Sequence, residues 1–263
     1  IYAFPFLVWF IFSGLRKFRW NLWKPVLIIL IVAFFMNLGY YSRNFNLYGY
    51  PHAKLNYLTN GITLPLFISN IVRNITLHLG TPSKSVNHVM YKIIRLIHKI
   101  LGVAINDSRI TAYGDFSINF SLHEDSTGNF VHLIFIMVSV IIFFIARQKI
   151  RRRDIIYYLV ALVSVFFILC FLIKWTPWNS RYHLPLLVLF CPFITIVFSR
   201  ISNHRIPNLI AVFLIMSSFR WVFSNDSRPL IKDFKASKTE NVFNTTRIEQ
   251  YFRNWPALKD AYM

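Results

Sequence analysis

The sequence has few acidic residues and few cysteines. Asp and Glu together number 10 of the 263 residues, against 29 Lys and Arg, which gives a formal net charge of +19. A charge of this size raises the question of nucleic acid, but the basic residues stand beside apolar runs, so we expect no nucleic-acid partner. The two cysteines, Cys170 and Cys191, both lie in apolar runs, which excludes a disulfide framework and a CxxC metal or redox motif.

Nucleotide-binding motifs are missing too, since the chain has neither a P-loop nor a GxGxxG pattern. Apolar residues, in contrast, are abundant: they form 56% of the chain, aromatics form 18%, and the mean hydropathy is +0.47. This composition predicts an integral membrane protein. The chain begins at Ile1 inside an apolar stretch that lacks the basic region and cleavage site of a signal peptide, so we expect an internal fragment of a longer protein.

Apolar runs separated by short polar stretches predict an all-α fold with about six transmembrane helices. The runs cover residues 1–14, 25–41, 130–146, 155–173, 184–198 and 206–223. Basic residues cluster after the first, third and fifth runs, which predicts that these connections are cytoplasmic: Arg16, Lys17, Arg19 and Lys24, then Arg147, Lys149, Arg151, Arg152 and Arg153, then Arg200 and Arg205.

The alternation divides the chain into four parts. Residues 1–41 hold two transmembrane helices, the first truncated, and residues 130–223 hold four more. Residues 42–129 form a long extracytoplasmic loop, and residues 224–263 begin an extracytoplasmic C-terminal domain. We therefore expect the segments 42–129, 174–183 and 224–263 to share one face of the membrane.

Two amphipathic helical patterns occupy the long loop. In "LPLFISNIVRNITLHL" (64–79) and "SVNHVMYKIIRLIHKIL" (85–101), apolar residues recur at spacings of three and four, and Lys92, Arg95 and Lys99 fall on the other face of the second pattern. We expect interfacial helices with their apolar faces in the acyl boundary and their basic residues toward lipid phosphates. The alternative is that the two helices pack on each other as a small extracytoplasmic subdomain.

The stretch "KWTPWNSRYHLPL" (174–186) is dense in aromatic and basic residues for a short connection. Trp175, Trp178 and Tyr182 are typical of membrane-surface anchors, and Lys174 of a cation that reaches for the headgroups. Arg181, in contrast, is a planar, bidentate donor suited to a lipid-linked phosphate. His183 could donate to the same phosphate or cap a helix.

The stretch "LHEDSTGNFVHL" (122–133) places two of the few acidic residues together before an apolar run. His123, Glu124 and Asp125 could begin a helix, could bind a divalent cation, or could supply a carboxylate for acid/base chemistry or sugar binding. His132 lies just inside the apolar run, where polar groups usually face the protein interior.

"WNSRYHLPL" and "LHEDSTGNFVHL" resemble segments of bacterial multi-spanning glycosyltransferases of the GT-C superfamily, which includes protein O-mannosyltransferases and lipid A aminoarabinose transferases. The tail "NTTRIEQYFRNWPALKDAY" also looks like the start of their outer domain. The resemblance implies a polyprenyl-phosphate-linked sugar as donor and transfer at the outer face of the cytoplasmic (inner) membrane. It places Arg181 and His183 near the donor phosphate, and it places the catalytic carboxylate before Ile1.

These observations predict a membrane glycosyltransferase that moves a sugar from a polyprenyl phosphate to a glycan, lipid or protein acceptor in the cell envelope. Arg181, His183, Lys174, Tyr182, Glu124 and Asp125 are the expected substrate-binding residues. His123, Glu124 and Asp125 are the expected ligands if a divalent cation takes part. The alternatives are a transporter or flippase of lipid-linked or anionic solutes, for which Pro185 and Pro192 would break a helix, and a non-catalytic membrane scaffold.

Overall fold

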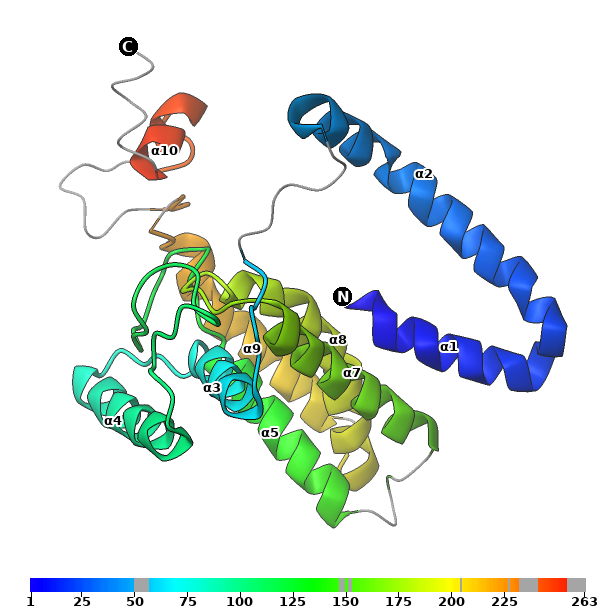
Figure 1. Cartoon of the computed structure of the whole chain (residues 1–263). Helices are drawn as coiled ribbons and strands as arrows, with labels where there is room; N and C mark the ends of the chain where they lie inside the picture. The colour runs from blue at the N-terminus through cyan, green and yellow to red at the C-terminus, as the bar shows by residue number, and fades with distance from the viewer. Residues whose placement is uncertain are drawn as a thin grey trace.

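The structure of the chain is a computed structural model that describes residues 1–49, 57–146, 150, 153–203, 205–226, 228–231 and 241–254. It is all-helical, and the only β pairing in these residues is two isolated bridges. The helices, drawn in Figure 1, are α1 (Ala3–Phe18), η1 (Arg19–Leu22), α2 (Trp23–Tyr48), α3 (Leu64–Thr76), α4 (Lys84–Leu101), α5 (Phe130–Ile145), α7 (Arg153–Leu172), α8 (Ser180–Ile201), α9 (Arg205–Phe223) and α10 (Arg247–Asn254).

Four helical stretches of the described residues are long and apolar enough to cross a membrane. They are Ala3–Tyr48, which joins α1, η1 and α2, and the helices α7, α8 and α9. The helix α5 is apolar but has only 16 residues. A helix therefore stands at each of the apolar runs, and the all-α, membrane-type prediction is confirmed, whereas the number of six spans is not established by these lengths.

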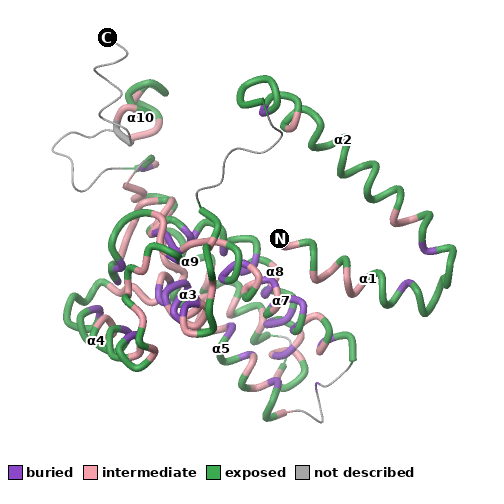
Figure 2. The backbone as a smooth tube through the Cα atoms, viewed as in Figure 1, coloured by how far each residue is buried: buried purple, intermediate pink, exposed green. Residues whose placement is uncertain are grey.

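The helices α5, α7 and α8 pack together around one apolar core, and α9 lies against α5 and α8. Large aliphatic and aromatic side chains fill this core, among them Leu162, Val165, Phe193 and Val197, which are fully buried. Such close packing of side chains is what orients the helices relative to one another. Figure 2 shows the buried positions concentrated in this bundle and in α3.

The helices α1 and α2 are joined by η1 and diverge from it (Figure 1). The helix α1 packs on α7, and Gly14 of α1 leaves room for the side chain of Leu22 from η1, which a Cβ atom would displace. The hydroxyl of Tyr2 donates to the backbone carbonyl of Tyr182 at the start of α8. In contrast, α2 is exposed along almost its whole length (Figure 2), as expected of a helix that faces lipid.

The polar segments between the helices gather at one end of the bundle, where α5 and α8 begin and α7 and α9 end. We call it the loop end. Thr59 N–H donates to the Leu172 carbonyl (3.0 Å), and Asp226 N–H donates to the Leu122 carbonyl (3.2 Å). Segments from 57–129, 173–179 and 224–231 are thereby joined at this end of the bundle. The basic residues Arg147, Lys149, Arg151 and Arg152 lie outside the described residues.

The amphipathic patterns of the long loop form the helices α3 and α4, but their packing differs from the expectation. The apolar stripe of α3 is partly exposed, with Leu64 at 70%, and its polar side chains point inward instead. Asn70 shows why this is stable: its amide donates to the carbonyls of Cys170 (2.6 Å) and Ile173 (2.8 Å) at the end of α7, where carbonyls lack helical partners. The helices α3 and α4 also contact each other, as the subdomain alternative expects, while the interfacial position stays a prediction.

Candidate functional site

The connection between α7 and α8 is joined to the long loop by the two isolated bridges. Leu58 pairs with Ile173 in antiparallel fashion and Thr111 pairs with Trp175 in parallel fashion. Trp175 N–H donates to the Ile110 carbonyl (2.8 Å), and Ala112 N–H donates to the Trp175 carbonyl (3.1 Å). Because backbone pairing sets the position of the residues on either side, Tyr57 and Tyr113 are placed next to the connection.

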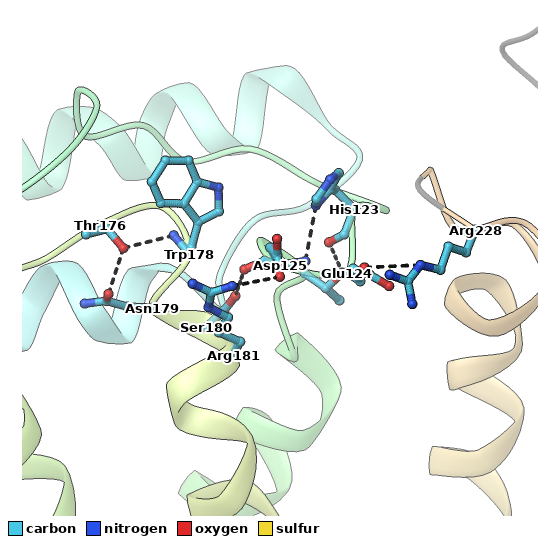
Figure 3. A network of polar contacts seen from close by, with 10 residues as sticks. His123, Glu124, Asp125, Thr176, Trp178, Asn179, Ser180, Arg181 and Arg228 are labelled. Atoms are coloured by element: carbon cyan, nitrogen blue, oxygen red, sulfur yellow. Dashed lines mark hydrogen bonds and ion pairs between the residues drawn. The ribbon is translucent and has the colours of Figure 1, made fainter. Parts of the chain in front are cut away.

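An exposed ion pair lies at the start of α8. The guanidinium Nη1 of Arg181 contacts Oδ1 of Asp125 at 3.2 Å, and the side chains are 48% and 38% exposed. The neighbouring Ser180 hydroxyl donates to the Asp125 backbone carbonyl (3.0 Å), which holds the Asp125 turn against the helix. Figure 3 shows Arg181 and Asp125 facing each other at the loop end. The two sequence stretches selected as candidates therefore meet in space.

Glu124 points the other way, toward the end of α9. Its Oε1 lies 3.9 Å from Nε of Arg228, and both side chains are more than a third exposed. Exposed pairs of this kind contribute little to stability. Asp125 therefore places its carboxylate beside the cation of Arg181 from α8. Glu124 places its carboxylate beside the cation of Arg228, from the segment after α9.

The structure does not form the metal site or the helix start expected at this stretch. His123, Glu124 and Asp125 diverge (Figure 3), because consecutive residues of a turn project their side chains to different sides. The His123 ring accepts the Asp125 N–H (3.2 Å). Among the described residues no three His, Cys, Asp or Glu side chains converge to hold a metal ion. The helix α5 begins later, at Phe130, with no acidic residue in its first turn.

Exposed aromatic rings stand beside Arg181. The Tyr57 and Tyr113 centroids are 5.5 Å apart, Tyr113 lies 6.1 Å from Trp178, and the Arg181 guanidinium carbon lies 5.4 Å from the Tyr182 ring. These rings are between 37% and 44% exposed. A hydrogen bond with Tyr113 raises the pKa of Tyr57, and the positive charge of Arg181 acts in the opposite direction.

A polar cavity of about 350 Å³ adjoins the Asp125 turn on its other side. Small hydroxyl and amide side chains line it, including Thr76, Ser117, Asn119, Ser121 and Ser126. A second hollow of about 520 Å³ lies between the start of α5 and the end of α9. Most of its surface is apolar, but polar side chains, including Arg220 and His132, also line it.

The other residues expected at the site are placed differently. Lys174 donates to the Ser108 carbonyl (2.9 Å), and Trp175 is 1% exposed, so this Trp is a core residue and not a surface anchor. His183 is 3% exposed, although Arg181 is accessible. Two residues along a helix are separated by about 200°, so these side chains necessarily leave opposite faces of α8.

His183 contacts His78 inside the protein. The Nε2 atom of His78 lies 2.9 Å from Nδ1 of His183, and the Asn129 N–H donates to Nδ1 of His78 (3.2 Å). The neutral His78 ring therefore carries its proton on Nε2 and donates it to His183. Burial, reinforced by His132, lowers the pKa of His78 from 6.5 to about 4.

The lowered pKa of His78 predicts that the loop end becomes less stable at acid pH. The unfolded chain binds a proton at His78 between pH 6.5 and about pH 4 that the folded protein does not, so stability falls as the pH drops through this window. The resulting loss in the free energy of unfolding is up to about 3 kcal/mol. Thermal unfolding in detergent at about pH 7 and pH 4.5 should show a smaller drop in His78→Gln than in wild type. The control His88→Gln, on the exposed side of α4, should behave like wild type; an equal drop in all three proteins would contradict the prediction.

Sequence reasoning missed the two loop tyrosines and His78. Tyr57 and Tyr113 lie more than 60 residues before Trp178, and the bridge pairings that bring them together carry no sequence motif. The His78–His183 pair joins residues 105 positions apart. A comparison of the chain with protein families, with curated proteins and with solved structures finds no match.

Proposed function

We propose that the chain is part of a membrane glycosyltransferase that takes a sugar from a polyprenyl-phosphate donor and transfers it to a cell-envelope acceptor at the outer face of the bacterial cytoplasmic membrane. The observation that carries the proposal is the accessible Arg181, held beside Asp125 and surrounded by exposed aromatic rings at the loop end. A guanidinium is suited to a phosphate, a carboxylate accepts hydrogen bonds from sugar hydroxyls, and an aromatic ring packs against the apolar side of a sugar.

Sugar transfer requires that the negative charge developing on the leaving phosphate be stabilised. An acceptor hydroxyl attacks the anomeric carbon, the bond between that carbon and the phosphate oxygen breaks, and the electron pair remains on the polyprenyl phosphate. Arg181 offsets this developing charge, as preorganised donors do in other transfer reactions. The contact to Asp125 uses one donor, Nη1, and releasing it would free the guanidinium for the phosphate. A general base, which we do not assign to a residue of this chain, takes the acceptor proton.

The surroundings suit a lipid-linked donor. The polar cavity beside Ser126 has room for a sugar, and the mainly apolar hollow between α5 and α9 has room for the first units of a prenyl chain. In this proposal α1, α2, α5, α7, α8 and α9 all cross the membrane, with flanking aromatic residues completing the shorter α5. The helix α8 continues through Pro185 and Pro192 from Ser180 to Ile201, so it is not the discontinuous helix typical of transporters.

The test is transfer of a radiolabelled sugar by membranes that contain the protein. Labelled polyprenyl-phosphate sugars, each with a different sugar, are supplied together with isolated envelope as acceptor. We expect label to enter the envelope fraction, and we expect no transfer from a sugar nucleotide when synthesis of the lipid-linked donor is blocked. Transfer from the nucleotide alone, or no transfer from any lipid-linked sugar above membranes without the protein, would contradict the proposal.

A further inference from the structure

The helix α4 has three faces, not two. At 100° per residue, one face carries Met90, Ile94 and Ile97, a second carries the basic residues, and a third carries another row of aliphatic side chains. In the sequence pattern the two apolar rows form one stripe. In the structure the first row packs against the protein and the second row is exposed. Figure 2 colours most of α4 as exposed.

The inward face attaches α4 to the loop end. Ile94 is 7% exposed and packs with Phe116 and Trp175, while Tyr91 stacks on Phe116 at 6.1 Å. The His98 ring adds a polar contact, with Nε2 at 2.8 Å from the Ser69 hydroxyl of α3. The orientation of α4 is therefore set by packing, and the rest of the helix surface is available to another partner.

The outward aliphatic face has no cover among the described residues. Its side chains are 44% to 77% exposed: Val86, Val89, Ile93, Leu96 and Ile100. They follow one another at spacings of three and four, so they form one continuous strip along the helix. A soluble surface helix would normally present polar side chains at such positions, and a contiguous exposed apolar strip indicates an interaction site.

The remaining face of α4 is cationic. Lys92, Arg95 and Lys99 are exposed beside the aliphatic strip, and no ion pair to them occurs in the described part of the chain. The whole of α4 contains no acidic residue. Arg95 and the two lysines also line a shallow, open cleft of about 540 Å³ together with Val103 and Ile105.

We propose that α4 docks in the surface of the bilayer, with its aliphatic strip among the acyl chains and its Lys92–Arg95–Lys99 cleft holding the phosphate of an anionic phospholipid. Charge complementarity selects this occupant over a second copy of the chain, because a copy has the same formal net charge of +19 and would repel the three cations, whereas an anionic lipid attracts them. Aliphatic and cationic faces side by side are what a helix lying in the interface requires. The proposal does not depend on the sugar-transfer function.

The experiment places a bimane label on single cysteines of the whole protein in nanodiscs, in a Cys170→Ala, Cys191→Ser background. Ile93→Cys and Ile100→Cys report on the aliphatic strip, and His88→Cys is the matched control on the cationic side of the same helix. Asp115→Cys, exposed elsewhere in the long loop, is the aqueous reference. Brominated phosphatidylcholine and brominated phosphatidylglycerol serve as acyl-chain quenchers, and iodide as the aqueous quencher.

We expect both brominated lipids to quench Ile93→Cys and Ile100→Cys strongly and Asp115→Cys weakly, with the reverse order for iodide. His88→Cys should fall between them. Brominated phosphatidylglycerol should act at a mole fraction at least about fivefold lower than phosphatidylcholine, since one cation near an anionic surface contributes about a fivefold preference. Changing Lys92, Arg95 and Lys99 together to Gln should remove that preference and leave the acyl quenching.

Each other result overturns the proposal. Iodide quenching of Ile93→Cys as strong as that of Asp115→Cys would place the strip in water. Protection from iodide and from both lipids would show that protein, such as a second copy, covers the strip. An unchanged lipid preference in the triple Gln variant would show that the cleft does not hold the headgroup.

Discussion

Replacing Arg181 with alanine is expected to lower the rate of sugar transfer about 100-fold or more. The guanidinium faces the position proposed for the leaving phosphate, and removing one preorganised donor from a developing anion typically costs two to three orders of magnitude. The same transfer assay measures the effect. Arg181→Lys should recover part of the rate, because an ammonium keeps the charge but loses the planar, bidentate geometry.

Arg109→Ala is the matched control for this substitution. Arg109 also belongs to an ion pair at the loop end, with Nη2 at 2.8 Å from Asp107 Oδ2 and its own side chain about half exposed, but it does not belong to the Arg181 site. Its loss should change transfer less than twofold, because Arg109 does not face the position proposed for the leaving phosphate. Equal losses in both variants would indicate a general effect on the loop end, and a fully active Arg181→Ala would remove this residue from the mechanism.

Replacing Arg73 with methionine is expected to destabilise the loop end by about 3 kcal/mol. Arg73 is fully buried in α3, and its guanidinium donates to the carbonyls of Ile105 (2.9 Å) and Ile110 (3.0 Å) and to the Thr111 hydroxyl (2.7 Å). Methionine fills a similar volume but leaves these acceptors without a donor. Each buried acceptor that loses its hydrogen-bond partner costs about 1–3 kcal/mol.

The charge of Arg73 strengthens this expectation. Burial lowers the pKa of its guanidinium to about 9, which still leaves the group charged at neutral pH. Its carbon lies 5.5 Å from the Trp175 ring centroid, so its charge also faces an aromatic surface. Thermal unfolding and hydrogen exchange at residues 105–111 measure the loss. Arg95→Met, on the exposed side of α4, should leave both unchanged; similar values for the two variants would contradict the role given to Arg73.

The membrane-type, all-α architecture could be predicted from the sequence because apolar runs of suitable length have few other structures available to them. The positions of α3 and α4 followed from the spacing of their apolar residues. Their packing did not, because periodicity shows that a helix has an apolar stripe without showing what covers it. In α3 the side chains of Asn70 and Arg73 are buried by pairing with carbonyls that belong to distant segments.

The site could be predicted in part. Arg181 and Asp125 were selected from separate stretches, and their pairing follows from the shared end of the bundle. His183 was assigned to the same surface because it stands two residues from Arg181, and the helical rotation places it inside instead. The metal hypothesis considered residue types without their directions, whereas the turn at His123 sends the side chains apart.

The central claim is tested most directly by determining where the donor binds. A polyprenyl-phosphate sugar with a photoreactive group next to the phosphate is crosslinked to the protein in membranes, and the labelled peptides are mapped by mass spectrometry. We expect adducts in the segments 121–129 and 174–183, reduced by unlabelled donor and by Arg181→Ala. Competable adducts confined to the opposite end of the bundle, near residues 201–206, would contradict the proposed site.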